Sequence, residues 1–265
     1  MAIVASGHAT STTVFRCTTR LTDYTPEGSV GDGGTISDGG SSRQILNTVQ
    51  QKTSGGRIPF GVLGLAFPFT VVVRAYYRAP ASGTDYRNLI SKGGVFINGR
   101  LAVGWRNDYS KPFDYWESAG QGGEETTGTT LTDDTLYTFI VRHQSGTQNF
   151  NYCNTDIGGA GVHFVAQNTD TSSTEGTDGS ETIYLGGPTN WAANPQEDGC
   201  EAGIIGCIIY DTYISDALRD SIGDGGFWDE FPAEASGSVI AGHLAGPGGL
   251  AGPGGLAGNH GGIAG

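Results

Sequence analysis

Residues 181–188 read E-T-I-Y-L-G-G-P, and residues 201–222 read E-A-G-I-I-G-C-I-I-Y-D-T-Y-I-S-D-A-L-R-D-S-I. The first stretch is typical of a short strand that ends on two glycines, because β-branched and aromatic residues lead up to a turn signal. The second predicts a long apolar strand that runs into a short helical turn. Cys207 lies among isoleucines there, which indicates a buried central strand. We therefore expect the rest of the chain to supply strands that pair with these two.

The composition favours strands over helices. Glycine accounts for 46 of the 265 residues, methionine occurs once and only 15% of the residues are charged. A chain of this length can bury one substantial core, so one compact domain with a tail is the simplest organisation. The net charge of −13 argues against a protein that binds phosphate backbones, since such proteins neutralise phosphates with Lys and Arg. Nucleic acid is therefore not an expected partner.

The N-terminus does not resemble an export signal. Residues 1–10 read M-A-I-V-A-S-G-H-A-T, without the basic region and the long apolar run of a secretory signal peptide. No stretch of the sequence approaches the ~18 apolar residues of a membrane-spanning helix, so membrane insertion is not expected. We expect the chain to fold in a cytoplasm.

The cysteines agree with a reducing compartment. They are Cys17, Cys153, Cys200 and Cys207. Their spacings match neither a metal knuckle nor a redox pair, which favours reduced thiols that pack in the core. A disulfide is the alternative, with Cys200–Cys207 or Cys17–Cys153 as the pairs to test.

Alternating side chains predict most of the other strands. We expect strands within residues 11–24, 69–77, 100–105, 136–144 and 162–166. The stretch 69–77 is the strongest core strand, because it is apolar and prolines bound it on both sides. Residues 95–98 and 100–105 are expected to form a hairpin around Asn98-Gly99, the commonest type I′ dipeptide.

Polar, Gly-rich stretches predict loops. Residues 26–42 contain almost no apolar side chain, and residues 107–130 form a second long loop that carries several aromatic residues. Residues 43–53 place apolar residues at helical spacing, although a strand at a sheet edge is nearly as plausible. The aromatic residues of 223–234 are expected to anchor the exit of the chain against the domain or a neighbouring chain.

The opening stretch resembles the concanavalin A-like superfamily, in its laminin-G-like branch. The matching residues are Leu185-Gly186-Gly187, Gly203, Ile205, Ile209, Tyr210, Asp211, Ile214, Ser215, Asp216 and Ala217. The resemblance implies an all-β jelly-roll β-sandwich, in which the strand at 11–24 pairs near the closing strand because jelly rolls bring their ends together. It also implies a strand at 86–94, of the family's x-x-L-x-s-K-G type, and a strand at 149–154 as the hairpin partner of 136–144. It specifies function weakly, since the fold hosts lectins, glycanases, adhesion modules and virion proteins.

The last part of the chain is periodic. Glycine recurs at every third position, at Gly246, Gly249, Gly252, Gly255, Gly258 and Gly261. A collagen-like triple helix and packed extended glycine-rich chains both need this period, and several chains build both structures. We therefore expect a tail that assembles the protein, most simply into a homotrimer. A flexible Gly-rich linker is the alternative.

Catalytic motifs are missing from the sequence. Glycanases of the resembled superfamily carry an E-x-D-x-x-E strand, and no such string occurs here. A G-x-S-x-G elbow, an H-E-x-x-H helix and a P-loop are missing too, so we expect neither an enzyme nor a cofactor. Asp108, Asp114 and Asp198 are candidate calcium ligands by the resemblance, but solvated acidic loops explain them better and no metal is assigned.

Aromatic residues mark the candidate ligand site. It comprises Trp105, Asn107, Asp108, Tyr109, Tyr115 and Trp116, with Trp191 as a second position. Flat apolar faces beside hydrogen-bonding groups commonly hold sugars and protein partners. A subunit interface is favoured over glycan contact at these residues. Simple packing is the third alternative, in particular for Trp105 at the end of a strand.

Two parts of the chain are therefore expected, a laminin-G-like jelly-roll sandwich over residues 1–235 and a Gly-X-Y assembly tail over residues 236–265. Such a chain most resembles a bacteriophage structural protein, either a capsid decoration or head fibre protein or a tail adhesin. It would fold in the host cytoplasm and act in the virion, with other virion proteins and a host-surface glycan as partners. The alternative is a free carbohydrate-binding protein or a glycan-active enzyme of the same superfamily.

Overall fold

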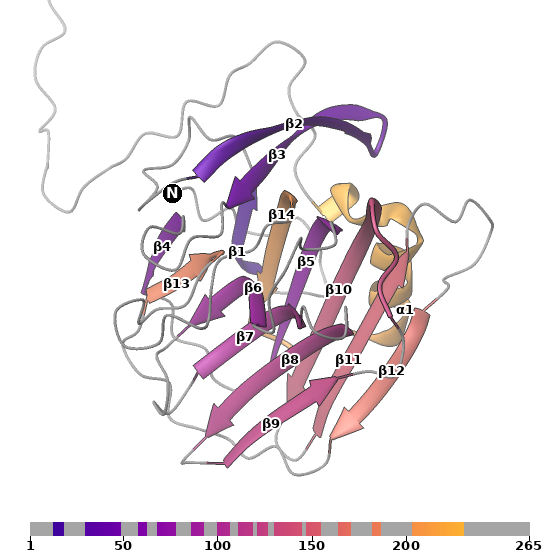
Figure 1. The fold of residues 1–265 in the computed structure, drawn as a ribbon. Coiled ribbons are helices and arrows are strands. Elements are labelled where there is room, and N and C mark those ends of the chain that lie inside the picture. Colours follow the sequence, from indigo (N-terminus) through magenta and orange to yellow (C-terminus); the bar gives the residue numbers. More distant parts are fainter. Residues whose placement is uncertain are drawn as a thin grey trace, which may run out of the picture.

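A computed structural model gives the fold of the chain (Figure 1). The residues that it describes are 13–18, 30–48, 58–62, 68–77, 86–92, 100–106, 111–118, 121–126, 130–144, 147–154, 164–170, 182–186 and 203–230. Two antiparallel sheets pack face to face, and short helices near the end of the described chain cover the other side of the larger sheet. The predicted all-β sandwich is confirmed.

Among the described residues, the larger sheet has eight strands. They are β1 (Thr13–Thr18), β2 (Val30–Asp38), β3 (Ser41–Thr48), β5 (Phe69–Tyr77), β10 (Thr135–Gln144), β11 (Thr147–Asn154), β12 (Phe164–Asp170) and β14 (Gly203–Tyr210). Their order is β12-β11-β10-β5-β14-β3-β2, and β1 and β3 share one edge of β14. β14 is therefore an interior strand, as its unbroken apolar run predicted, and the predicted pairing of the N-terminal strand with it is confirmed.

The described part of the chain places six strands in the smaller sheet. They are β4 (Ile58–Val62), β6 (Tyr86–Lys92), β7 (Arg100–Arg106), β8 (Lys111–Ser118), β9 (Gln121–Thr126) and β13 (Thr182–Leu185), in the order β4-β13-β6-β7-β8-β9. β13 ends on Gly186, whose positive φ of 71° favours glycine and whose N–H donates to the carbonyl of Leu89 at 2.9 Å. Gly186 thus ends the strand, in agreement with the prediction, while Gly187 lies outside the described residues.

The core lies between the two sheets. Alternate residues of β5, from Phe69 to Tyr77, face the smaller sheet and are fully buried there with Leu89, Leu101 and Trp105. The other residues of β5 lie on the opposite face of the larger sheet, because successive side chains of a strand alternate. Residues 69–77 therefore form a core strand, as predicted.

The outer face of the larger sheet is covered by residues 211–230, which we call the helical cover. It contains α1 (Asp216–Ser221), η2 (Ile222–Gly226) and η3 (Trp228–Glu230). Apolar side chains of the cover pack on those of β5, β10 and β14; they are Ile214, Ile222 and Phe227 against Val72, Ile140, Ile208 and Tyr210. None of the helices in the described residues is long and apolar enough to cross a membrane. The predicted anchoring of the chain exit by aromatic residues is confirmed for Phe227.

Two loop predictions are wrong. Residues 26–42 contain β2 and the start of β3, where a loop was predicted. Residues 43–48 continue β3, so the strand alternative is confirmed there and the helical interpretation is wrong. Gly39 and Gly40 join the two strands with φ of 58° and 74°, the two positive angles that a type I′ hairpin needs. A Gly-Gly pair is a hairpin signal, but the polar strands beside it show no apolar alternation, so the whole stretch was predicted as a loop.

The region 107–130 is also not a single loop, because β8 and β9 lie within it. The strand at 100–105 is confirmed as β7, but its partner is not residues 95–98. Leu101 pairs with Lys92 of β6 on one edge and with Trp116 of β8 on the other. Both edges of β7 are occupied, so the hairpin register centred on Asn98-Gly99 is wrong.

The topology separates one of the two cysteine pairs. Cys17 lies in β1 and Cys153 in β11, and β14, β5 and β10 run between these strands. Neighbouring strands are about 4.8 Å apart, whereas a disulfide needs Cα atoms within about 7 Å. The alternative of a Cys17–Cys153 disulfide is therefore wrong. Cys200 lies outside the described residues.

Candidate functional site

Trp105 belongs to the core rather than to an exposed ligand site. It is 1% exposed and lies on β7 between the two sheets. Its indole packs edge-on against Tyr77, with ring centroids 5.0 Å apart, and its ring centroid is 6.2 Å from that of Phe139. The packing alternative therefore holds for this residue. The candidates Asn107, Asp108, Tyr109 and Trp191 lie outside the described residues.

Tyr115 and Trp116 lie side by side on β8 and belong to different rows of the smaller sheet. Trp116 pairs with Leu101 of β7, a residue of the core. Tyr115 pairs with Ala102 of β7 and with Glu124 of the edge strand β9. Consecutive strand residues alternate between the two faces of a sheet. Tyr115 and Trp116 therefore belong to opposite faces of the sheet, and Tyr115 is the candidate in the row that does not contain Leu101.

The acidic and glycine candidates are placed only in part. Asp114 lies on β8, opposite Val103 of β7 and Glu125 of β9, while Asp108 and Asp198 lie outside the described residues. Within the described part of the chain, no group of three or more His, Cys, Asp or Glu residues is placed to hold a metal ion. The assembly glycines from Gly246 to Gly261 also lie outside the described residues.

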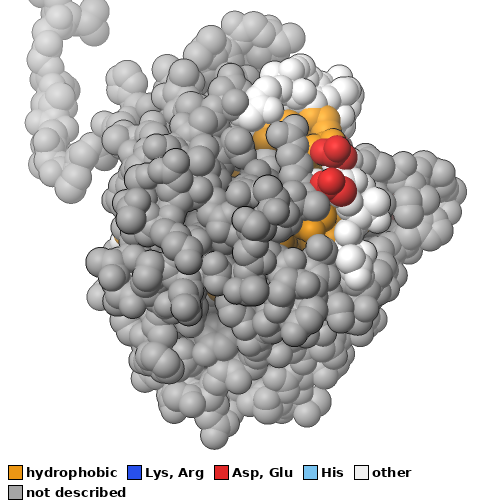
Figure 2. Space-filling view, in the orientation of Figure 1, with side chains coloured by type: hydrophobic (Ala, Val, Ile, Leu, Met, Phe, Trp, Pro, Cys, Tyr) orange, Lys and Arg blue, Asp and Glu red, His pale blue; other side chains and the backbone are white. Residues whose placement is uncertain are grey.

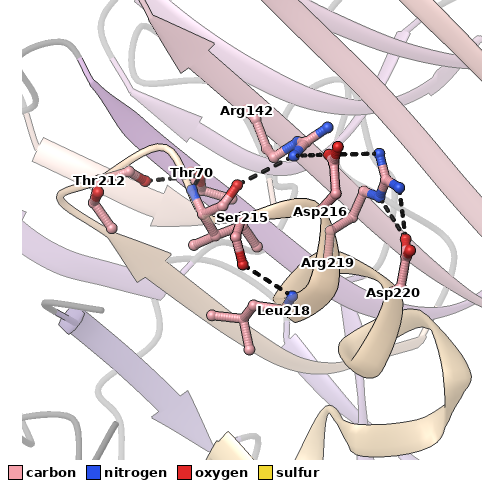
Figure 3. A network of polar contacts seen from close by, with 9 residues as sticks. Thr70, Arg142, Thr212, Ser215, Asp216, Leu218, Arg219 and Asp220 are labelled. Atoms are coloured by element: carbon pink, nitrogen blue, oxygen red, sulfur yellow. Dashed lines mark hydrogen bonds and ion pairs between the residues drawn. The ribbon is translucent and has the colours of Figure 1, made fainter. Parts of the chain in front are cut away.

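A polar network fastens the start of the helical cover to β10 (Figure 3). The Arg142 guanidinium, which is 2% exposed, donates to the carboxylate of Asp216 at 2.7 Å and to the carbonyl of Ile214 at 3.1 Å. Arg219 makes ion pairs with Asp216 at 3.0 Å and with Asp220 at 2.6 Å. The hydrogen bond from Arg142 and then the charges of the two arginines hold the pKa of Asp216 below its usual value.

Two hydroxyl groups fix the turn between β14 and α1 (Figure 3). Thr70 donates to the carbonyl of Thr212 at 2.8 Å and accepts from the N–H of Ile214 at 3.2 Å. Ser215 is the N-cap of α1, and its side chain accepts from the N–H of Leu218 at 3.2 Å. These hydrogen bonds satisfy backbone N–H and C=O groups that the turn would otherwise leave without a partner. The cover therefore begins at a defined position on the sheet.

A second cluster, which we call the Asp38 cluster, fastens the end of the cover. Asp38 at the end of β2 accepts two hydrogen bonds from the buried guanidinium of Arg74 and one from the indole Nε1 of Trp228 at 2.6 Å. The guanidinium of Arg43 lies 3.8 Å from the centroid of the Trp228 ring, a cation–π distance. Charge, hydrogen bonds and ring contacts thus join β2, β3, β5 and the cover at one point.

Close packing between backbone and rings completes this attachment. A Cβ atom added to Gly39 would lie 2.3 Å from Trp228, and one added to Gly206 would lie 2.9 Å from Phe227. Only glycine lets the two aromatic rings approach the hairpin and β14 this closely. The hydroxyl of Tyr210 also donates to the buried Glu230 at 2.7 Å. These glycines and the two polar clusters were not among the sequence candidates, although Arg74 and Arg142 stand out as charges within apolar strands.

The exposed side of the helical cover is acidic. Asp211, Asp216, Asp224 and Asp229 are exposed, whereas Arg219, the one basic residue of the cover, is 13% exposed. Figure 2 shows acidic and hydrophobic side chains next to each other on the described surface of the face that it draws, and no Lys or Arg among them. The described surface therefore offers no basic patch for an anionic ligand on this side.

His143 gives the stability of the sandwich a dependence on pH. It is fully buried on β10, stacked on Phe69 with ring centroids 4.6 Å apart, and burial lowers its pKa from 6.5 to about 3. The unfolded chain binds this proton below pH 6.5 and the folded chain does not, so stability is lost as pH falls from about 6.5 towards 3. We expect the contribution of His143 to fall by about 1.4 kcal/mol per pH unit well below pH 6.5.

Urea unfolding between pH 4.5 and 7 measures this slope. A His143→Gln variant carries no proton at this position, so its stability should change less with pH than that of the parent. The carboxylates titrate in both proteins, so their contribution cancels when the pH slope of the variant is subtracted from that of the parent. Equal slopes for the two proteins would contradict the assignment.

Comparisons with known proteins find the fold but no family. No family model and no curated protein matches the chain. Domain 4 of AbnA, a GH43 extracellular arabinanase from Geobacillus stearothermophilus, in complex with arabinotriose, is 11% identical with a TM-score of 0.52, covering 75% of this chain and 87% of that chain. The binding domain of Botulinum Neurotoxin DC in complex with SialylT is 9% identical with a TM-score of 0.51, covering 76% and 45%. At such identities the likeness shows a shared β-sandwich and nothing more.

Tailspike protein 2 of a bacteriophage is a further similar structure. Its enzymatically active domain, from bacteriophage CBA120, is 11% identical with a TM-score of 0.48, and the match covers 70% of this chain. The chain spans only 28% of the length of that domain and 25% of the full-length tailspike.

The expectation that the chain is not an enzyme needs correction. GH54 α-L-arabinofuranosidases are among the similar structures, at 12% and 10% identity. Domain 4 of AbnA, at a TM-score of 0.52, shows that a sandwich of this kind occurs in a glycoside hydrolase chain, so the missing E-x-D-x-x-E string does not exclude catalysis. The comparisons do not show that this chain is an enzyme either.

Proposed function

We propose that the protein is a structural component of a bacteriophage particle, a capsid decoration or head fibre protein or a tail adhesin. Its sandwich, of the concanavalin A-like type, attaches to a glycan, and its Gly-X-Y tail joins copies into a trimer. Two proteins that share the fold were solved with arabinotriose and with SialylT, which supports a saccharide as the ligand. The glycine period of the tail supports assembly, because only glycine fits a close-packed axis.

The pairing of Tyr115 is the observation that carries the glycan proposal. Its neighbours in the sheet are Ala102 of β7 and Glu124 of β9. Two positions before it, Phe113 pairs with Gly104 and Thr126 in the same row. The row thus combines two aromatic residues, Phe113 and Tyr115, with the small residues Ala102 and Gly104 and the acidic Glu124. An aromatic face with few, fixed polar groups is the arrangement that commonly holds a sugar ring.

Replacing Tyr115 with alanine should weaken glycan binding about tenfold, the loss of roughly 1.4 kcal/mol that one well-placed aromatic contact supplies. The parent is first applied to a glycan array that includes arabinotriose and sialylated oligosaccharides, and the affinity for the best binder is then measured by calorimetry. Tyr213→Ala is the matched control, because Tyr213 lies on the opposite side of the larger sheet beside Arg142. Equal loss in both variants, or no binding by the parent, would contradict the proposal.

The assembly half of the proposal has its own test. Gly252→Val with Gly255→Val should reduce the trimer that light scattering detects, because a side chain cannot enter a close-packed glycine seam. Gly248→Val with Gly254→Val is the matched control, since these glycines lie outside the three-residue period. Retention of the trimer in both double variants would leave the tail as a linker. A monomer that binds glycans equally well without residues 236–265 would favour a free carbohydrate-binding protein.

A further inference from the structure

Two cysteines meet across the strands that join the beginning and the end of the sandwich. β1 and β14 are antiparallel, and Cys17 is the direct partner of Cys207 in their register. Cys207 is fully buried in the core between the sheets. Directly opposed residues of two antiparallel strands lie on the same face of a sheet. The fold thus brings together two cysteines that are far apart in the sequence.

The spacing of such a pair suits a disulfide. Direct partners in antiparallel strands have Cα atoms about 4.5 or 5.5 Å apart, depending on the type of pair. Both values fall within the range of about 4.4–6.8 Å over which disulfides form. We propose that Cys17 and Cys207 are a redox site, which forms a cross-strand disulfide when the protein meets an oxidising environment.

The reaction needs an oxidant, which a low-molecular-weight disulfide such as oxidised glutathione supplies. The thiolate of one cysteine attacks a glutathione sulfur, forms a mixed disulfide and releases one glutathione thiolate. The thiolate of the second cysteine then attacks the protein sulfur of the mixed disulfide, and the second glutathione thiolate leaves. Two protein thiols are oxidised, one oxidised glutathione is reduced to two thiols, and the two protons pass to glutathione.

The position of β1 makes this bond consequential. Within the described residues, β1 is hydrogen-bonded to β14 alone, whereas β14 is also paired with β5 and β3. A strand with one neighbour opens more readily than an interior strand, and opening admits the oxidant to the buried Cys207. The disulfide would then fix β1 to the centre of the larger sheet and close a loop that contains most of the chain.

Peptide mapping tests the site directly. The reduced full chain is equilibrated in glutathione buffers from reducing to oxidising, in one arm as the native protein and in another during refolding from urea. Thiols are then blocked with iodoacetamide, and the digest is read by mass spectrometry. We expect a linked peptide that contains Cys17 and Cys207, and an oxidised protein whose Tm is higher by roughly 5–10 °C.

Variants separate this bond from other oxidation. Cys17→Ser should abolish both the linked peptide and the oxidation-dependent rise in Tm, while the matched Cys153→Ser variant should keep both. A link in either arm supports the proposal, and formation during refolding alone agrees with the burial of Cys207. The proposal is overturned if Cys17 and Cys207 are both alkylated by iodoacetamide in both arms at the most oxidising potential. A disulfide from Cys17 to another cysteine also overturns it. The result does not depend on whether the sandwich binds glycans.

Discussion

Replacing Arg74 with methionine is expected to lower the free energy of unfolding by about 3–5 kcal/mol, the usual cost of removing one partner from a buried ion pair. Arg74 is 4% exposed and makes two hydrogen bonds to Asp38, with a third to Thr138 at 2.7 Å. Without the guanidinium, the carboxylate of Asp38 stays buried and loses both hydrogen bonds from Arg74. It keeps the hydrogen bond from the indole of Trp228. Equilibrium unfolding in guanidinium chloride measures the lost free energy, and the m-value should stay unchanged.

Two comparisons show whether the buried charge causes the loss. A double variant that adds Asp38→Asn should recover part of it, since no unpaired charge is then buried. Asp220→Asn removes an ion pair from a residue whose side chain is 45% exposed, and it should cost less than about 1 kcal/mol. An Arg74→Met variant that loses no more stability than Asp220→Asn would contradict a structural role for the Asp38 cluster.

Replacing Trp105 with alanine is expected to cost a similar amount, about 3–5 kcal/mol, through the cavity that a large aromatic side chain leaves in a core. The indole packs against Tyr77 of β5 and Phe139 of β10 and thus joins the two sheets. Urea unfolding measures this loss, and Trp105→Phe should retain a large part of the stability because an aromatic ring still fills the space.

Glycan binding separates the two roles that the sequence left open for Trp105. A folded Trp105→Phe variant should bind the array's best saccharide as the parent does, because the indole is buried and cannot touch a ligand at the surface. Lost affinity with unchanged stability would instead return Trp105 to the ligand site.

The apolar strands were predictable because a run of mostly apolar residues predicts a buried strand. β5, β10 and β14 are runs of apolar side chains, and each lies within the larger sheet between two neighbours. β2 and β9 were not predictable in this way, because they are sheet-edge strands rich in Gly, Asp, Glu and Thr. These two strands form because an adjacent strand pairs with them, and their own sequences do not identify that strand.

The candidate site shows the same division. The sequence indicated aromatic residues around β8, but only the register separates Tyr115 from Trp116 and places each in its row. The two polar clusters were less accessible, because Arg74 and Asp38 are 36 positions apart and Arg142 and Asp216 are 74 positions apart. A charge inside an apolar strand signals that a partner exists, and the fold alone identifies that partner.

The position of β14 sets the order in which the sheet can be completed. Of the strands that the structure describes, β14 comes last along the chain, yet it lies between β5 on one edge and β1 and β3 on the other. The ribosome releases the N-terminal part of a chain first. The edges of β1, β3 and β5 that pair with β14 therefore stay unpaired until residue 210 has left the ribosome. Pairings of such long range form slowly and leave strand edges open to association. Residues 1–210 carry 13 Lys and Arg against 20 Asp and Glu, a net charge of −7, and this like charge disfavours contact between neighbouring nascent chains during the interval.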